Sequence, residues 1–147
     1  MKNILFLCTG NYYRSRFSEE YFNYYAQKFG LPWKADSMGL QRSFNGNGNV
    51  GPIATNTLNK LAELDIRPTG HQRMPKRVEA DHFAEFDRVI AVSKDEHQPM
   101  LASLWPESVI SKVAYFDVED LHIEGPGTAL PRLITHLDRL IDSLSKA

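Results

Sequence analysis

A short apolar run, a polar loop and a helical pattern follow one another at the start of the chain, and this succession restricts the fold more than any other feature. Residues 4–7 are continuously apolar, which predicts a buried strand, and the pattern becomes helical from about Ser15. The connecting octet, residues 8–15, reads CTGNYYRS. A strand, a tight loop and a helix in this order direct several backbone N–H groups and the positive end of the helix at one point. We therefore expect this loop to bind a phosphate-sized oxyanion.

The octet contains the only cysteine of the chain, Cys8. Helix N-termini and nearby cations favour the thiolate form of cysteine, so Cys8 is expected to be a nucleophile at neutral pH. The planar guanidinium of Arg14 can bind two oxyanion oxygens at once, and the Ser15 hydroxyl can donate to the sulfur. Gly10 lets the backbone turn, and Asn11 tolerates left-handed φ/ψ. The alternative is a cysteine packed as a small hydrophobic residue in a core strand, which explains neither the Gly-Asn pair nor the Arg-Ser pair.

Composition argues against several classes of function. The 17 Lys and Arg nearly balance the 18 Asp and Glu, so we expect neither a nucleic-acid partner nor a membrane partner. The chain has no apolar stretch of bilayer length and no signal-peptide core at its start, and one cysteine allows no internal disulfide. We expect a cytoplasmic location from these features. The five His are scattered and no zinc or calcium motif is present, so we expect no metal or other cofactor.

Strand-like and helical segments alternate along the chain. This alternation predicts one domain, residues 1–147, with an open parallel sheet and helices on both faces. In such sheets ligands gather beyond the carboxyl ends of the strands, so we expect Cys8, Ser37, Ser93 and residues 117–120 to meet at one edge. Beyond the first strand, the expected strands lie at residues 34–38, 88–92 and within 109–116, and the expected helices at residues 16–29, 53–64, 79–85, 94–104 and about 130–144.

A thiolate in such a loop implies attack on phosphorus followed by hydrolysis of a phosphocysteine. This reaction needs an acid that protonates the leaving oxygen and then deprotonates water. Residues 117–120, DVED, follow the last expected strand and form the richest acidic cluster at the expected edge. We favour Asp120 for this role, with Asp117 as the second choice.

These motifs resemble the low-molecular-weight protein tyrosine phosphatase family, which includes thioredoxin-coupled arsenate reductases and bacterial phosphoarginine phosphatases. The resemblance covers nearly the whole chain, and its most specific match is the octet at residues 8–15. Further matches lie at residues 37–40, 70–73, 88–97 and 116–120. The resemblance implies a four-stranded parallel sheet flanked by helices and a reaction that needs no metal ion.

The resemblance also implies roles for individual residues. It makes Cys8 the nucleophile, Arg14 the clamp on the phosphate and Asp120 the general acid and base. Ser37 and His71 would surround Asn11 outside the loop. The remaining phosphate-binding positions would be Thr9, Gly10, Asn11, Tyr12, Tyr13 and Ser15.

The sequence departs from the family pattern at three places. Tyr13 stands where many members carry a second cysteine, so the disulfide that can shield the nucleophile is absent. Leu and His follow Asp120 where proline and an aromatic residue are usual. Without the proline the acid loop has more conformations available. Without the aromatic residue the pocket loses one stacking wall for a phosphoaryl group. Tyr12 replaces an aliphatic residue or threonine. Tyr12 or Phe44 could supply the missing aromatic wall of the pocket.

The leading hypothesis is a phosphomonoester hydrolase that acts on protein phosphotyrosine. Its substrate would be a phosphorylated protein or a small phosphomonoester, and we expect a monomer or a weak homodimer. One alternative is arsenate reduction, which would require an external thiol because the chain has no resolving cysteine. Another is a phosphate-binding pseudo-enzyme, which the altered acid loop suggests.

Overall fold

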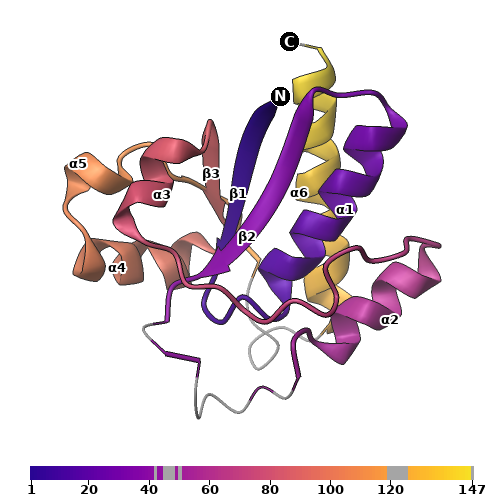
Figure 1. Cartoon of the computed structure of the whole chain (residues 1–147), viewed down its shortest axis with the longest axis horizontal. Helices are drawn as coiled ribbons and strands as arrows, with labels where there is room; N and C mark the ends of the chain where they lie inside the picture. The colour runs from indigo at the N-terminus through magenta and orange to yellow at the C-terminus, as the bar shows by residue number, and fades with distance from the viewer. Residues whose placement is uncertain (42, 45–48, 50, 119–125, 147) are drawn as a thin grey trace.

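A four-stranded parallel sheet forms the centre of the protein, as a computed structural model shows (Figure 1). The structure describes residues 1–41, 43, 44, 49, 51–118 and 126–146. The strand order is β2-β1-β3-β4, and every neighbouring pair runs parallel. The expected open sheet of four parallel strands is therefore confirmed. The strands are β1 (Lys2–Cys8), β2 (Trp33–Gly39), β3 (Arg88–Ala91) and β4 (Ala114–Tyr115).

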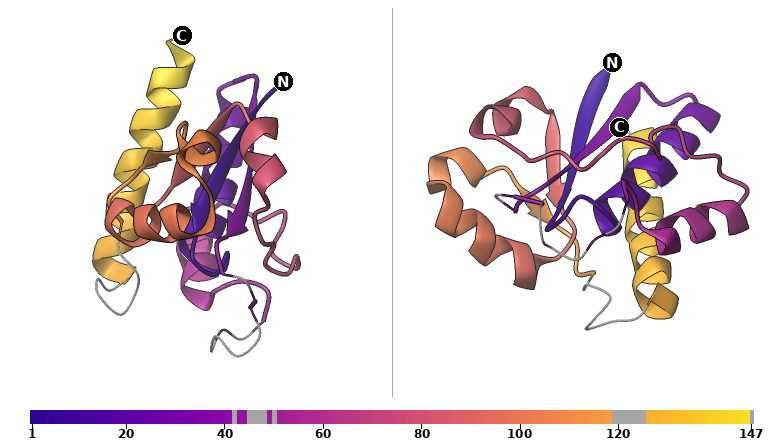
Figure 2. Two further views of the ribbon diagram at one scale, coloured as in Figure 1. Left: turned by 90° about the vertical axis from the view of Figure 1, so that its left-hand side faces the viewer. Right: turned by 60° about the horizontal axis from the view of Figure 1, so that its bottom comes forward.

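Helices cover both faces of the sheet (Figure 1 and Figure 2). On one face lie α1 (Arg14–Lys28) and α6 (Pro126–Ser145), with α2 (Thr55–Glu63) beside α1. The other face is covered by α3 (Ala80–Glu85), α4 (Lys94–Leu104) and α5 (Glu107–Ile110). Buried side chains form two separate clusters, one for each of these layers.

The strand β1 lies between the two layers, which explains its continuous apolar run. Ile4, Phe6 and Cys8 belong to the cluster with α1 and α6, whereas Leu5 and Leu7 belong to the cluster with α3, α4 and α5. The four residues at positions 4–7 are 0% exposed. A strand buried on both faces has no polar side, so its sequence shows no alternation. This buried strand carries Cys8 at its carboxyl end.

The amphipathic pattern at the end of the chain forms α6, a helix of 20 residues. Its apolar stripe packs against α1. Leu133 and Leu137 of this stripe are 0% exposed. None of the helices in the described part of the chain is both long and apolar enough to cross a lipid bilayer.

The connection between α4 and β4 holds a helix that the sequence analysis did not expect. Trp105 ends α4 and packs its ring against Phe83, with the ring centroids 5.1 Å apart. Pro106 is the N-cap of α5, which spans four residues and is too short for hydrophobic periodicity to reveal. Within the expected segment 109–116, only Ala114–Tyr115 pairs as a strand.

Candidate active site

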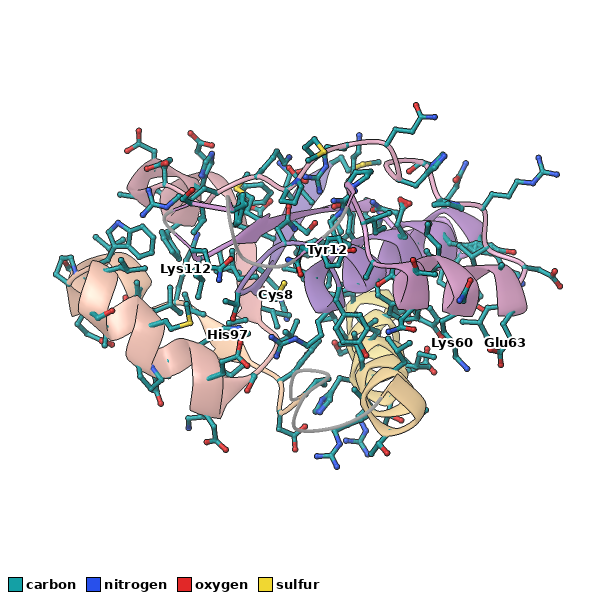
Figure 3. All side chains as sticks on the ribbon, turned by 90° about the horizontal axis from the view of Figure 1, so that it is seen from below. Cys8, Tyr12, Lys60, Glu63, His97 and Lys112 are labelled. Atoms are coloured by element: carbon teal, nitrogen blue, oxygen red, sulfur yellow. The ribbon has the colours of Figure 1, made fainter. Side chains whose placement is uncertain are left out.

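The carboxyl ends of the strands bring the expected site residues to one edge of the sheet. Cys8, the last residue of β1, pairs with Gly39 at the end of β2. Beyond β3 and β4, Ser93 bridges to Asp117. Seen from this edge, Cys8 projects between Tyr12 on one side and His97 of α4 on the other (Figure 3). The expected convergence of strand ends is therefore present for these described residues.

Cys8 and Ser15 are in direct contact. The distance from Cys8 Sγ to Ser15 Oγ is 2.9 Å, and the two residues are 3% and 0% exposed. Ser15 Oγ also accepts a hydrogen bond from Asn11 Nδ2 at 2.9 Å. Because Asn11 donates to this oxygen, the Ser15 hydroxyl proton is available to the sulfur. Such a donor stabilises negative charge on sulfur.

Asn11 holds the turn of the loop in a left-handed conformation, with φ of 48°. Its Nδ2 donates to Ser15 Oγ and to Ser37 Oγ, both at 2.9 Å. Its Oδ1 accepts from Arg73 Nη1 at 3.1 Å and from the backbone N of Lys76 at 2.9 Å. Asn11 is 0% exposed, so these four hydrogen bonds use the full capacity of a buried amide.

Arg73, rather than His71, joins Ser37 around Asn11. Ser37 Oγ donates to Glu19 Oε1 at 2.6 Å, and Arg73 Nη2 lies 3.0 Å from the same oxygen. Burial raises the pKa of Glu19, while the Ser37 hydroxyl and the Arg73 charge oppose that shift. His71 is exposed, and the structure does not bring it to Asn11. The longer side chain of Arg73, two positions further on, reaches the amide in its place.

Arg14 is held between two other parts of the fold. It is the first residue of α1 and is 2% exposed. Its Nη1 donates to the backbone oxygen of Val118 at 3.0 Å, just after β4, and its Nη2 donates to Glu96 Oε2 at 2.8 Å in the first turn of α4. The orientation of this guanidinium is therefore set by tertiary contacts as well as by its own helix.

A polar cluster around Glu96 was not anticipated by the sequence analysis. Glu96 Oε2 accepts from the Thr9 hydroxyl and lies 2.9 Å from Nε2 of His97, which is 0% exposed. Burial alone would raise the pKa of Glu96, but the hydrogen bonds from His97 and Arg14, the Arg14 charge and the Thr9 hydroxyl hold that pKa well below its usual range. In the sequence, an acidic residue in the first turn of a helix looks like a solvated partner of the helix dipole.

Aromatic side chains border the loop. A Cβ atom on Gly39 would lie 2.9 Å from the backbone oxygen of Thr9 and 3.0 Å from Cε1 of Phe44, so the Phe44 ring packs where β2 meets the loop. Tyr12 is half-buried beside the cluster that includes α1 and α6. Tyr13 is 5% exposed within that cluster, so its ring is part of the core. Phe44 and Tyr12 thus remain the candidates for a pocket wall.

Arg16 is a further residue beside the loop that the sequence did not predict. It is 1% exposed, and its guanidinium donates to the backbone oxygens of Pro52 at 2.8 Å and Gly70 at 2.6 Å. It also reaches the backbone oxygen of Asn11 at 3.5 Å. Burial, with a contribution from the Arg73 charge, lowers the pKa of Arg16 to about 10. Arg16 therefore ties the loop to two segments that are distant in sequence.

Of the two candidate acids, Asp120 lies outside the described residues and Asp117 is placed. The Asp117 side chain is 68% exposed and pairs with His136 and Arg132 of α6. The hydrogen bond from His136 lowers the pKa of Asp117. A carboxyl group held ionised in this way is a poor proton donor near neutral pH. Among the residues that the structure describes, no three side chains of metal-binding type lie close enough to hold an ion.

Several solved structures share this fold. YfkJ from Bacillus subtilis is 25% identical, with a TM-score of 0.80 and coverage of 99% of this chain and 96% of that chain. A low molecular weight protein tyrosine phosphatase from T. tengcongensis is 26% identical, with a TM-score of 0.71 and coverage of 99% of both chains. The YwlE arginine phosphatase of Bacillus subtilis is 23% identical, with a TM-score of 0.72 and coverage of 98% and 93%. At that identity the likeness to YwlE concerns the fold alone.

The family of this chain is identified by a match to a family sequence profile. A sequence search among curated proteins finds no match. The sequence profile described as low molecular weight phosphotyrosine protein phosphatase matches residues 3–130, a range that contains the loop at residues 8–15 and all four strands except the first residue of β1. The chain therefore belongs to the low molecular weight phosphotyrosine protein phosphatase family.

Proposed function

We propose that this family phosphatase hydrolyses phosphomonoesters through a phosphocysteine on Cys8 and that its substrate is protein phosphotyrosine. The observation that carries the proposal is the 2.9 Å contact between Cys8 Sγ and Ser15 Oγ at the start of α1, the helix whose first residue is the buried Arg14. A sulfur with a hydroxyl donor at the N-terminus of a helix is suited to attack a phosphoryl group.

In the first step, Cys8 Sγ attacks phosphorus, and an S–P bond forms as the bond from phosphorus to the ester oxygen breaks. The leaving oxygen takes a proton from Asp120, which becomes a carboxylate. Arg14 and the backbone N–H groups of the loop bind the phosphoryl oxygens, where negative charge is concentrated in the transition state. The products of this step are the free alcohol or phenol and a phosphocysteine.

In the second step, a water molecule attacks the phosphocysteine and gives a proton to Asp120. The S–P bond breaks, inorganic phosphate is released, and the sulfur leaves as a thiolate. The Ser15 hydroxyl lowers the energy of that thiolate by donating a hydrogen bond to it. Asn11 supports this step because it holds Ser15 Oγ in place at 2.9 Å.

Two aromatic side chains beside the loop support phosphotyrosine as the substrate. Phe44 packs where β2 meets the loop, and Tyr12 is half-buried within the loop itself. Flat rings offer a stacking surface to the phenyl ring of phosphotyrosine. The structural neighbour described as an arginine phosphatase makes phosphoarginine the comparison substrate.

Hydrolysis of p-nitrophenyl phosphate by the purified protein tests the reaction. We expect turnover by the wild type and only background turnover by Cys8→Ser, because a serine hydroxyl is not ionised at neutral pH. The double variant Cys8→Ser/Ser103→Cys is a matched control, since it keeps one thiol in the protein but places it at the exposed Ser103 of α4. Turnover that persists in either variant would overturn the mechanism.

Peptides of one sequence that carry phosphotyrosine, phosphoarginine or phosphoserine test the substrate. We expect kcat/KM to be highest for phosphotyrosine. A higher kcat/KM for phosphoarginine would replace the substrate assignment and leave the reaction at Cys8 intact.

A further inference from the structure

We infer that Glu96 is a positioning residue for Arg14: its carboxylate, braced by Thr9 and His97, fixes the guanidinium in the orientation that receives the phosphoryl group. This inference rests on the proposed function, because it concerns the same phosphate site. Glu96 lies in the first turn of α4, on the layer opposite to α1. We call Glu96 in this role the brace of Arg14. Its contact with Arg14 joins the two helical layers across the end of β1.

The contacts of Arg14 fix its guanidinium at two points. Nη2 donates to Glu96 Oε2 at 2.8 Å, and Nη1 donates to the backbone oxygen of Val118 at 3.0 Å. A guanidinium is planar, so acceptors on two of its nitrogens define both its position and the plane in which it lies. Loss of the Glu96 contact removes one of these two points, so the plane of the guanidinium is held less firmly.

The brace itself is rigid. Glu96 stands on a helix whose N-cap is Ser93, and Ser93 Oγ accepts from the backbone N of Glu96 at 3.3 Å. Its side chain is 21% exposed. The Thr9 hydroxyl donates to the same Glu96 oxygen that binds Arg14, which ties the loop to the brace at Thr9. A carboxylate held on a helix positions its partner more closely than one carried by a loop.

The hydrogen bonds of the His97 ring identify which of its two nitrogens carries the proton. Its Nδ1 accepts a hydrogen bond from the backbone N of Ser93 at 3.1 Å, so that nitrogen carries no proton. The proton of the neutral ring is then on Nε2, which lies 2.9 Å from Glu96 Oε2 and 3.1 Å from Thr9 Oγ1. His97 therefore donates into the cluster, and its orientation is set by the same helix N-terminus that carries Glu96.

Glu96 could instead be a competitor, that is, a carboxylate that binds Arg14 where the phosphate would bind. The three donors on Glu96 Oε2 argue against that role. A carboxylate that merely occupied the place of the phosphate would depend on Arg14 for its binding. Glu96 is instead held independently of Arg14, by Thr9, by His97 and by its own helix. The two roles predict opposite effects on anion affinity, because removal of a brace weakens phosphate binding and removal of a competitor strengthens it.

The test compares Glu96→Gln with Asp95→Asn. Glu96→Gln keeps the shape and an acceptor oxygen but removes the charge, and Asp95→Asn removes the same charge from the exposed neighbouring position of the same helical turn. We expect Glu96→Gln to lower kcat for p-nitrophenyl phosphate by about 10- to 100-fold, since a displacement of about 1 Å at a reacting centre can cost about 100-fold. We expect the dissociation constant of orthophosphate, measured by isothermal titration calorimetry, to rise as well, while Asp95→Asn stays near the wild type in both measurements.

A double-mutant cycle with Arg14 separates positioning from general stability. If Glu96 acts through Arg14, adding Glu96→Gln to Arg14→Ala has little further effect on orthophosphate affinity, so the two losses are not additive. Additive losses would overturn the inference, as would tighter orthophosphate binding by Glu96→Gln or a loss equal to that of Asp95→Asn. Glu96→Asp is the second variant: its shorter carboxylate keeps the charge, and we expect it to recover part of the loss.

Orthophosphate binding keeps this inference separate from the proposed function, because it is measured without turnover. Wild-type protein that binds orthophosphate but hydrolyses no phosphomonoester would refute the proposed function, and weaker binding by Glu96→Gln would still support the brace. An unchanged kcat and an unchanged orthophosphate affinity in Glu96→Gln would refute the brace and leave the proposed function standing.

Discussion

Arg73 Nη1 donates to Asn11 Oδ1 at 3.1 Å, although the two residues are 62 positions apart in the sequence. The same guanidinium forms an ion pair with Glu19 at 3.0 Å. Asn11 is the left-handed residue of the loop and also holds Ser15, so this contact connects a distant segment to the hydroxyl beside Cys8. The geometry of the loop therefore depends on a residue outside it.

We expect Arg73→Ala to lower kcat for an aryl phosphate and to lower the free energy of unfolding by about 1–3 kcal/mol, because it removes a partner from the buried Asn11 amide. His71→Ala is the matched comparison two residues away, and its exposed side chain predicts nearly wild-type values. Steady-state kinetics and urea unfolding of both variants measure the effects. A larger loss from His71→Ala than from Arg73→Ala would contradict the observed network.

The close approach of β2 to the loop makes Gly39 intolerant of a side chain. A Cβ there would lie 2.9 Å from the backbone oxygen of Thr9 and 3.0 Å from the backbone N of Asn11, neither of which can move without distorting the loop. We expect Gly39→Ala to cost about 1–3 kcal/mol of unfolding free energy and to lower kcat. Gly70→Ala is the control, since its nearest neighbour would be a side-chain oxygen at 3.8 Å. Equal effects of the two substitutions would rule out this explanation.

The lowered pKa of Glu96 predicts how stability depends on pH. Because the pKa is lower in the folded protein than the ordinary 4.5, the folded state favours the carboxylate and gains stability from it above about pH 4.5. This gain declines as the pH falls below that value. We therefore expect the difference in unfolding free energy between the wild type and Glu96→Gln to be largest near neutral pH and to shrink on acidification. Urea unfolding at a series of pH values measures it, and a difference that grows in acid would contradict the assigned contacts.

The acid assignment predicts a dependence on the leaving group. We expect Asp120→Asn to lower kcat by about 10²–10⁴-fold for phenyl phosphate and much less for p-nitrophenyl phosphate, whose leaving group needs no proton. Asp117→Asn is the matched control, because Asp117 pairs with His136 of α6 and has a lowered pKa. A greater leaving-group effect in Asp117→Asn would transfer the role of acid to that residue.

Sequence patterns predicted the sheet because its strands and helices have local signals. The run at residues 4–7 is apolar throughout because both of its faces are buried, and the stripe through Leu133 and Leu137 gives α6 directly. The end of α1 also has a local signal, because Gly30 follows it with φ of 66°, a left-handed conformation that glycine adopts readily at the end of a helix. The four-residue helix α5 escaped prediction because one turn is shorter than a repeat of the helical pattern.

The polar contacts around the loop could not be predicted in this way. Glu96 and Arg14 are separated by 82 positions, and nothing in the local sequence of α4 distinguishes Glu96 from the exposed Asp95 beside it. His71 and Arg73 likewise differ in role only through the path of the segment that carries them. The residues of the loop were identified from their spacing, whereas the residues that hold the loop became visible only in the folded chain.

The most direct measurement of the central claim is the mass of the protein quenched during turnover of p-nitrophenyl phosphate, followed by peptide mapping. The account predicts one added phosphoryl group per chain, located on the sulfur of Cys8 and absent from Cys8→Ala. A phosphoryl group on any other residue, or turnover by Cys8→Ala at the wild-type rate, would contradict it.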